Sequence, residues 1–453
     1  MKRIITIVLL CLTLQMSGQC FTSISSGEYF TLGLKSDGTL WGWGSDSSGQ
    51  ITSGTFSNVT TAFQMSPDTN WSYISAGHSS AFAIKSDGTL WACGANTNGQ
   101  LGDGTTVFKS TLTQIGTATD WSKVMSSSSH TMAIKTDGTL WGWGLNSSGQ
   151  LGDGTTENKT TPTQIGTETN WSVVDSGSNF TIAIKSDGTL WAWGDNGGKL
   201  GDGTSINRIL PTQIGVDTNW STISLGYTHA IALKTNGTLW AWGNNFYYNL
   251  GDGTNTTRYA PVQIGSASDW ATISSQNIHT VAIKTNNTIW TWGNNNYGQL
   301  GLGNTTTQSS PTQIGSGTVW GIASAGGEHT EVLKTDGSLW SCGRNEYGQL
   351  GDGTLLNKTL FVSIACPTSL STTTPLSTAG IKAYPNPIED VLNLSFDKEI
   401  NDVSIYNQLG QEVLTQVINA KEGILTTSTL PSGTYLVKIA TMNEVQTVKV
   451  IKE

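Results

Sequence analysis

Residues 131–165 read TMAIKTDGTLWGWGLNSSGQLGDGTTENKTTPTQI, and this stretch decides the fold. Near its start, Asp137-Gly138 is a dipeptide that strongly favours a β-hairpin turn. The residues on either side, 131–135 and 139–143, are rich in apolar, aromatic and β-branched types. The stretch therefore predicts two antiparallel strands joined by a tight turn.

Two further strands complete the unit. Residues 121–125 form a short extended run, and residues 161–165 form another that contains Pro162. Proline is tolerated on the edge of a sheet, where its missing N–H faces solvent. Residues 146–155 contain Gly149, Gly152 and Gly154 and predict a long, turn-rich connection. Four strands in about 50 residues is the size of one propeller blade.

The same pattern recurs seven times. The motif Asp/Asn-Gly-Thr/Ser-Leu-Trp, degenerate in the sixth copy, begins at Asp37, Asp87, Asp137, Asp187, Asn236, Asn286 and Asp336. All 18 Trp fall within this array, which runs from about Phe21 to Ile364. We therefore predict an all-β fold with a seven-bladed β-propeller over residues 20–367, in which large aromatic side chains fill the wedges between blades.

The first 19 residues have the parts of a secretory signal peptide. Lys2 and Arg3 precede an apolar run of 11 residues from Ile4 to Leu14, and small residues follow it. The run is too short to span a bilayer, which takes about 20 residues. We expect an exported protein that is not a transmembrane protein.

The composition argues against nucleic-acid binding. The net charge is −9, only 12% of the residues are charged, and there are no basic runs. Binding to nucleic acid needs a cationic patch that neutralises phosphates. We therefore expect no nucleic-acid partner.

The five cysteines fit no zinc-binding spacing. Cys11 leaves with the signal peptide, and Cys93 and Cys342 occupy a repeat position that other blades fill with Trp, so we expect buried thiols. Cys20 and Cys366 bracket the array. If the array closes on itself, these two can form a disulfide, which export permits.

The repeat closely resembles that of a known family. Trp141-Gly142-Trp143-Gly144, Gly-Gln-Leu-Gly-Asp-Gly-Thr at 149–155 and Pro-Thr-Gln-Ile at 162–165 resemble the regulator of chromosome condensation repeat. The resemblance covers about three quarters of the chain and implies a seven-bladed propeller. The family's best-known activity is nucleotide exchange on a small nuclear GTPase, which an exported protein would not meet. The near-constant spacing also leaves no room for the wedge that those exchange factors insert. Protein binding is the expectation that remains, although a fold alone does not assign a function.

The composition of the chain changes after the repeat array. Residues 368–381 are Ser/Thr-rich and are interpreted as a linker, and residues 382–453 contain short alternating runs that predict a small β-sandwich. Tyr-Pro-Asn-Pro at 384–387 and Leu-Pro-Ser-Gly-Thr-Tyr at 430–435 resemble the C-terminal sorting domain of the type IX secretion system. The resemblance implies that residues 383–453 engage the secretion machinery. The protein would then cross the periplasm and outer membrane of a Gram-negative bacterium and be secreted or held at the cell surface. An ordinary carbohydrate-binding or adhesive sandwich is the alternative.

Residues that could carry chemistry recur too symmetrically to indicate an active site. Four histidines share one repeat position, which also accepts Phe: His130, His229, His279 and His329. The Asp of each Gly-Asp-Gly-Thr motif is typical of a tight turn, and the Lys before each hairpin fits stem packing. We therefore expect no catalytic residue, no metal site and no cofactor.

Residues that carry a function should differ from those at the equivalent positions of the other blades. Glu331 lies where the other blades have an apolar residue, so it would form an ion pair or lie in a more open final blade. The stronger candidate is an aromatic arc, because Tyr and Arg are enriched at binding hot spots. Tyr247, Tyr297 and Tyr347 share one loop position in blades five to seven, where blades one to four have Ser48, Asn98, Ser148 and Gly198; Phe246, Tyr248 and Arg344 lie beside them. The alternative is that each Tyr packs against its own loop.

The sequence thus predicts an exported propeller that binds another macromolecule, with protein favoured over glycan. A polysaccharide-binding or polysaccharide-degrading propeller is one alternative; as an enzyme it would need asymmetric acid and base groups at a channel mouth. A structural adhesion or surface component is the other.

Overall fold

The computed structural model describes residues 20–367 except 53, and residues 382–452 except 386, 408–410 and 442–444. The predicted signal peptide and linker lie outside the described residues. The chain divides into two compact units, Met1–Pro367 and Thr368–Glu453.

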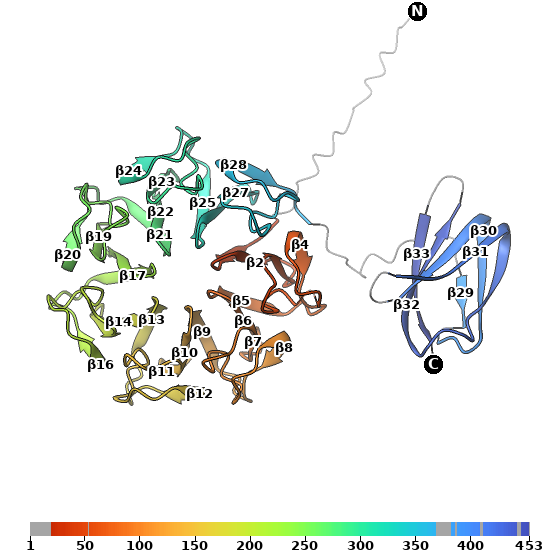
Figure 1. Ribbon diagram of the computed structural model, residues 1–453, viewed down its shortest axis with the longest axis horizontal. Helices are drawn as coiled ribbons and strands as arrows, with labels where there is room; N and C mark the ends of the chain where they lie inside the picture. Colours follow the sequence, from red (N-terminus) through yellow and green to blue (C-terminus); the bar gives the residue numbers. More distant parts are fainter. Residues whose placement is uncertain are drawn as a thin grey trace, which may run out of the picture. The chain divides into compact units, whose positions relative to one another are not determined.

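The first unit is a ring of seven four-stranded antiparallel sheets, in agreement with the predicted fold (Figure 1). The first strands lie nearest the axis: β1 (Ser23–Ser26), β5 (Trp71–Ala76), β9 (Trp121–Ser126), β13 (Trp171–Ser176), β17 (Trp220–Leu225), β21 (Trp270–Gln276) and β25 (Trp320–Ala325). The second strands are β2 (Phe30–Leu34), β6 (Ser80–Lys85), β10 (His130–Lys135), β14 (Phe180–Lys185), β18 (His229–Lys234), β22 (His279–Lys284) and β26 (His329–Lys334).

The third and fourth strands follow outward. The third strands are β3 (Leu40–Gly44), β7 (Leu90–Gly94), β11 (Leu140–Gly144), β15 (Leu190–Gly194), β19 (Leu239–Gly243), β23 (Ile289–Gly293) and β27 (Leu339–Gly343). The fourth strands form the rim: β4 (Val59–Gln64), β8 (Lys109–Gln114), β12 (Lys159–Gln164), β16 (Arg208–Gln213), β20 (Arg258–Gln263), β24 (Gln308–Gln313) and β28 (Lys358–Ile364).

The Asp-Gly turn forms as the sequence predicts. The amide of Gly138 donates to the carbonyl of Lys135 at 3.0 Å, and Asp137 accepts from both the amide and the hydroxyl of Thr139. Gly138 has φ +79, and a Cβ there would lie 2.1 Å from the carbonyl oxygen of Thr169. Glycine is therefore required at this turn, both for its backbone angle and for the close approach of the next loop.

Tryptophans join neighbouring blades. Trp143 is fully buried, and its indole N–H donates to the carbonyl of Gln100 in the preceding blade at 2.8 Å. Trp121 packs edge-on against both Trp141 and Trp143, with ring centroids 5.9 Å apart in each pair. The cation of Lys135 lies 4.5 Å from the centre of Trp141 and pairs with Asp120 at 3.0 Å.

The shared histidines also join blades. All four are fully buried, and each bonds through Nε2 to a hydroxyl of the following blade at 2.9–3.1 Å, the partners being Thr181, Ser275, Thr330 and Thr31. Burial lowers the pKa of His130, His229 and His329 to about 3 and that of His279 to about 4, so these rings stay neutral at ordinary pH.

The ring closes without any exchange of strands between its ends. Each blade is one contiguous stretch of chain, so blade one (β1–β4) and blade seven (β25–β28) share no sheet. They meet through packing and through hydrogen bonds such as that from the Ser26 amide to the Ser324 hydroxyl at 2.9 Å. A disulfide between Cys20 and Cys366 joins the two ends, and Cys93 and Cys342 are buried free thiols. The disulfide thus links the two ends of the ring covalently, and no sheet in the described part of the chain contains strands from both ends.

Glu331 in β26 lies in this closing interface and matches neither expectation for it. Its side chain is 0% exposed, so the blade is not open there, and neither carboxylate oxygen makes a hydrogen bond of normal geometry within the described part of the chain. Burial raises the pKa of Glu331 well above its usual value, and the neighbouring Trp43 indole offsets this only in part. Burial therefore favours the neutral, protonated form of this carboxyl.

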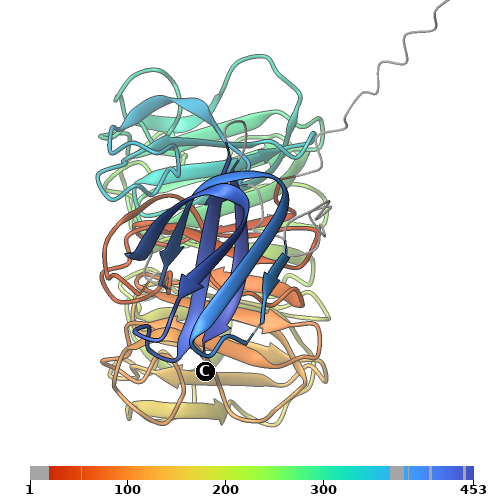
Figure 2. The same ribbon diagram turned by 90° about the vertical axis from the view of Figure 1, so that its right-hand side faces the viewer.

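The second unit is a five-stranded antiparallel sheet, shown in blue in Figure 2, where its long strands run side by side. Its strands are β29 (Lys382–Tyr384), β30 (Val391–Tyr406), β31 (Glu412–Thr426), β32 (Gly433–Ala440) and β33 (Val445–Lys452). Leu392, Phe396, Val403 and Val437 belong to its single buried core. No helix in the described residues would be long and apolar enough to cross a bilayer.

Candidate functional site

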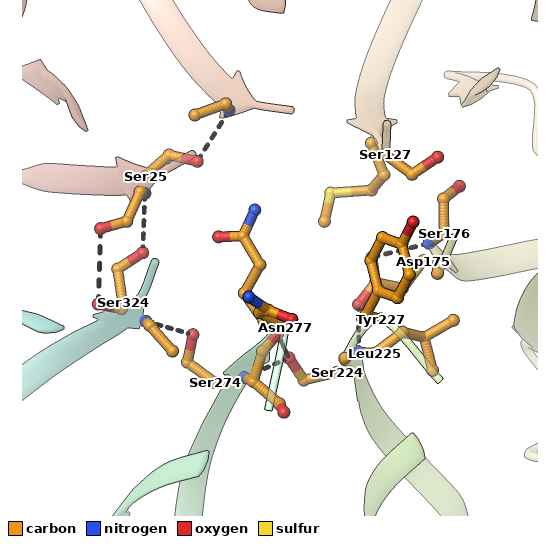
Figure 3. A pocket seen from close by; sticks show the side chains of 18 of the residues that line it. Ser25, Ser127, Asp175, Ser176, Ser224, Leu225, Tyr227, Ser274, Asn277 and Ser324 are labelled. Atoms are coloured by element: carbon orange, nitrogen blue, oxygen red, sulfur yellow. Dashed lines mark hydrogen bonds between the residues drawn. The ribbon is translucent and has the colours of Figure 1, made fainter. Parts of the chain in front are cut away.

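A cavity of about 440 Å³ lies on the axis of the propeller, lined by the first strand of every blade and the loop that follows it (Figure 3). The residue four positions after the opening aromatic residue of each blade faces this cavity. We call these seven residues the lumen column: Ser25, Ser75, Met125, Asp175, Ser224, Ser274 and Ser324. Five members are serine, so the column is nearly symmetric.

Four of the five serines of the lumen column connect their blade to the next. The hydroxyl oxygen of Ser25 accepts the backbone N–H of Ala76 at 2.9 Å, and Ser274 accepts that of Ala325 at the same distance. Ser224 and Ser324 make the corresponding bonds to Ser275 and Ser26, also at 2.9 Å. These bonds satisfy backbone donors that would otherwise face the lumen unpaired.

Met125 and Asp175 break the column together. Met125 has no hydroxyl, so it cannot accept the N–H of Ser176 in the next blade. Asp175 accepts that N–H through Oδ1 at 2.7 Å and, through Oδ2, accepts the N–H of Leu225 at 2.8 Å (Figure 3). One carboxylate therefore makes the bonds of two serines.

Asp175 has an unusual protonation equilibrium. Burial raises the pKa of Asp175 to about 7, against the opposing effect of the two backbone N–H donors. The carboxyl is thus partly protonated near neutral pH. Sequence comparison within the repeat could have found both residues, because they are the only non-serine members of their column.

We expect the two substitutions to be energetically coupled. Asp175→Ser alone should leave the buried N–H of Ser176 unpaired and destabilise the propeller by about 1–3 kcal/mol. In a Met125→Ser background the new hydroxyl can accept that N–H, so Asp175→Ser should cost at least about 1 kcal/mol less. Urea unfolding of the four proteins of this double-mutant cycle measures the difference. Equal costs in both backgrounds would show that Asp175 does not compensate for Met125.

The rim of the cavity lies on the face formed by the loops between first and second strands and between third and fourth strands. We call this the long-loop face. Glu28 and His78 form an ion pair there, and Tyr227 and Asn277 line the same rim. Asn277 has φ +43, a left-handed backbone angle that costs an ordinary residue energy. The rim is therefore far less symmetric than the serines below it.

The predicted aromatic arc lies on the long-loop face but divides into two parts. In the first part, the guanidinium of Arg344 lies 4.9 Å from the ring centre of Tyr297 and 5.4 Å from that of Tyr347. Arg344 also pairs with Glu328 at 2.7 Å and with Glu346 at 2.5 Å. This cation is fully engaged by its own protein, so Tyr297, Tyr347 and Arg344 form a packed cluster.

The second part is an exposed surface on blade five. Phe246 is 68% exposed, Tyr247 is 41% exposed, and their rings meet edge-on with centroids 5.0 Å apart. Tyr227, 47% exposed, lies in the other loop of the same blade, and a backbone bond from Asn244 to Thr228 ties the two loops together. We call Tyr227, Phe246 and Tyr247 the blade-five aromatic surface.

Tyr248 carries backbone strain beside this surface. It has φ +61, whereas the corresponding residue in most other blades is a glycine with φ between +75 and +82: Gly49, Gly99, Gly149, Gly298 and Gly348. Only glycine adopts this conformation without cost, and strain of this kind concentrates at functional sites. The loop of blade five thus combines exposed aromatic side chains with a strained backbone at Tyr248.

Comparison with known proteins identifies both units. The model of the RCC1-like domain matches residues 11–275, and models of the regulator of chromosome condensation (RCC1) repeat match residues 286–333 and 323–349. The model of the secretion system C-terminal sorting domain matches residues 382–453. No curated protein sequence matches the chain. Both resemblances seen in the sequence are thereby confirmed.

Solved structures show the same propeller. Human WBSCR16 has a TM-score of 0.66 at 20% identity, covering 73% of this chain and 94% of that one. Prp20p from Saccharomyces cerevisiae has a TM-score of 0.65 at 16% identity, covering 75% and 87% of the two chains. Yeast RCC1 bound to Kap60 has a TM-score of 0.64 at 16% identity, covering 71% and 82%. At these identities the likeness shows the fold and carries no function.

Different observations identify the two units of the chain. The propeller carries the family's repeat motifs in all seven blades, and residues 382–453 point to secretion or a cell-surface location. The chain belongs to the RCC1-like domain family and joins its propeller to a secretion-system sorting domain.

Proposed function

We propose that this protein is an exported binding module whose propeller binds another protein and carries out no catalysis. Type IX machinery would recognise residues 383–453, take the protein through the periplasm of a Gram-negative bacterium and deliver it to the surface or the medium. The blade-five aromatic surface is the observation that carries the binding proposal.

Three features support this surface as a binding site. Its aromatic rings expose large apolar areas, which are a common source of binding energy at interfaces. The other blades have small or polar residues at the position of Phe246, namely Ser47, Thr97, Ser147, Gly197, Asn296 and Glu346. The strained Tyr248 next to them shows that the loop departs from the repeat at an energetic cost.

The test compares two variants of the full-length secreted protein. Phe246→Ser/Tyr247→Ser should lower the affinity for a saturably binding protein partner by about 30-fold or more. Loss of two aromatic anchors typically costs over ~2 kcal/mol of binding free energy. Val107→Ser/Phe108→Ser is the matched control, because these residues are 59% and 52% exposed on blade two. Partners are isolated by cross-linked capture from neighbouring-cell and host fractions, and their affinities are measured by interferometry.

The competing functions have distinct outcomes. A partner that the blade-five variant still binds with full affinity would move the site elsewhere. The absence of any saturable partner would favour a structural surface component. New reducing ends released from a polysaccharide would favour an enzyme instead.

A further inference from the structure

The axial cavity has the size and enclosure of a small-molecule site. Its volume of about 440 Å³ lies within the usual range for ligand pockets, about 300–1,000 Å³. All seven blades contribute to its wall, and its rim reaches the long-loop face. A ligand on the axis would therefore contact residues from every blade.

The wall offers hydroxyl donors at fixed positions. The oxygens of Ser25 and Ser274 are already held by backbone N–H groups of the following blades. A hydroxyl can still donate its own hydrogen after accepting such a bond. The oxygens of these hydroxyl groups are therefore held in place by the blade contacts at the wall of the cavity, where Figure 3 shows Ser25 and Ser274, and their hydrogens can be donated to a ligand.

The wall also offers one strong acceptor. Asp175 is the only carboxylate in the lumen column, and each of its oxygens accepts one backbone N–H. A carboxylate has about four acceptor positions, so about two remain for a ligand. Adjacent hydroxyl groups of a ligand could occupy both.

The charges around the cavity disfavour ionic ligands. Among the described residues that line it there is no Lys or Arg, and the only basic group, His78, pairs with Glu28. An anionic ligand would find no Lys or Arg in the wall, and above about pH 7 the ionised Asp175 would repel it. A cationic ligand would use Asp175 but would leave the hydroxyl donors without acceptors.

Apolar groups complete the wall. Ile273 and Met125 are half-buried and line the cavity, and Tyr227 places an aromatic ring at the rim. Ile24 and Ile223 also line it, although most of their surface is buried in the core between blades. Sugars present both hydroxyl groups and apolar C–H faces, and aromatic side chains with one apolar and one polar end suit such ligands. The combination of fixed donors, one carboxylate and an apolar wall matches that pattern.

We propose that the axial cavity binds a small, neutral, polyhydroxylated ligand of the monosaccharide class, with Asp175 accepting hydrogen bonds from neighbouring ligand hydroxyls and the lumen serines donating. This site shares Tyr227 with the blade-five aromatic surface, but Phe246 and Tyr247 do not line it. The ligand could be a free sugar or the terminal residue of a glycan.

The experiment measures ligand binding to the full-length protein by saturation-transfer NMR and calorimetry. The probes are methyl glycosides of neutral hexoses and N-acetylhexosamines, the same sugars as termini of short oligosaccharides, glucosamine as a cation, and glucuronate as an anion. At least one neutral glycoside should bind saturably, and glucuronate should not. Binding of the oligosaccharides as well would show that the mouth admits a glycan chain, and binding of the free glycosides alone would assign the site to free sugar.

Variants locate the site on the axis. Asp175→Ser should weaken neutral-sugar binding at least about tenfold, as expected for loss of a charged hydrogen-bond acceptor. Met125→Ser/Asp175→Ser keeps the blade contacts of the repeat and should show the same loss, which separates binding from folding. Phe108→Ser is the control and should bind like the wild type. The proposal is overturned if no neutral sugar binds saturably, if both Asp175 variants retain full affinity, or if glucosamine binds more tightly than every neutral sugar.

Discussion

Reduction of the Cys20–Cys366 disulfide should lower the thermal unfolding midpoint of the propeller by about 5–10 °C. The disulfide closes a loop with a sequence separation of 346 residues, so in the chain-entropy description it destabilises the unfolded chain by about 6 kcal/mol. No strand is shared between blades one and seven, so the disulfide is the covalent constraint on that interface. Scanning calorimetry with and without a phosphine reductant measures the shift.

The double variant Cys20→Ser/Cys366→Ser isolates this effect. It should unfold at the reduced wild-type temperature, and the reductant should not lower its midpoint further. Cys93 and Cys342 are buried and already free thiols, so the reductant should leave both unchanged. If the reduced and oxidised propellers unfold together, the packing of blade one on blade seven is sufficient to hold the ring.

Glu331→Met should stabilise the propeller by about 1–3 kcal/mol at neutral pH, because it removes a buried carboxyl that makes no hydrogen bond of normal geometry with any described residue. Blade three has Met132 at the same position, so the repeat already accommodates this side chain, and the two residues have similar length. Chemical unfolding at several pH values measures the effect.

The pH dependence has a definite sign. Burial raises the pKa of Glu331 in the folded state, so above about pH 4.5 the folded protein binds more protons than the unfolded chain. Wild-type stability should therefore fall relative to Glu331→Met as the pH rises from that value. Glu331→Gln should lose the pH dependence and still carry an unpaired polar group, so it should be less stable than Glu331→Met. A gap between wild type and Glu331→Met that stays constant from pH 5 to 8 would show that Glu331 is not held neutral by burial.

Much of the architecture can be predicted from short stretches of sequence. The Asp-Gly pairs favour their hairpins, because glycine adopts the left-handed backbone angle without cost and leaves space for the neighbouring loop, as at Gly138; the sixth blade makes the same turn with Asn287 at φ +61. The Trp residues are large enough to span from one blade to the next, as Trp143 does to Gln100. These signals recur in seven blades, so the fold can be predicted even though the sixth copy of the motif is degenerate. The sorting domain was equally readable from its motifs.

The candidate sites were less readable. The aromatic arc predicted from the repeat appears on one face, but Arg344 is already held by Tyr297, Tyr347 and two carboxylates, which leaves the exposed part on blade five. Glu331 was recognised as unusual, yet the sequence favoured an ion pair or an open blade. Whether a side chain finds a partner depends on groups brought together by packing, which one position in a repeat does not reveal.

The sequence by itself determined the seven-bladed ring, its secretion tail and the two cysteines that could close it, because turn residues, strand period and repeat length act over short distances. The tertiary structure decided what the ring encloses. Residues about 50 positions apart, such as Asp175 and Leu225, meet only when neighbouring blades pack against each other. The backbone partners and the raised pKa of the lumen carboxylate are properties of that packing.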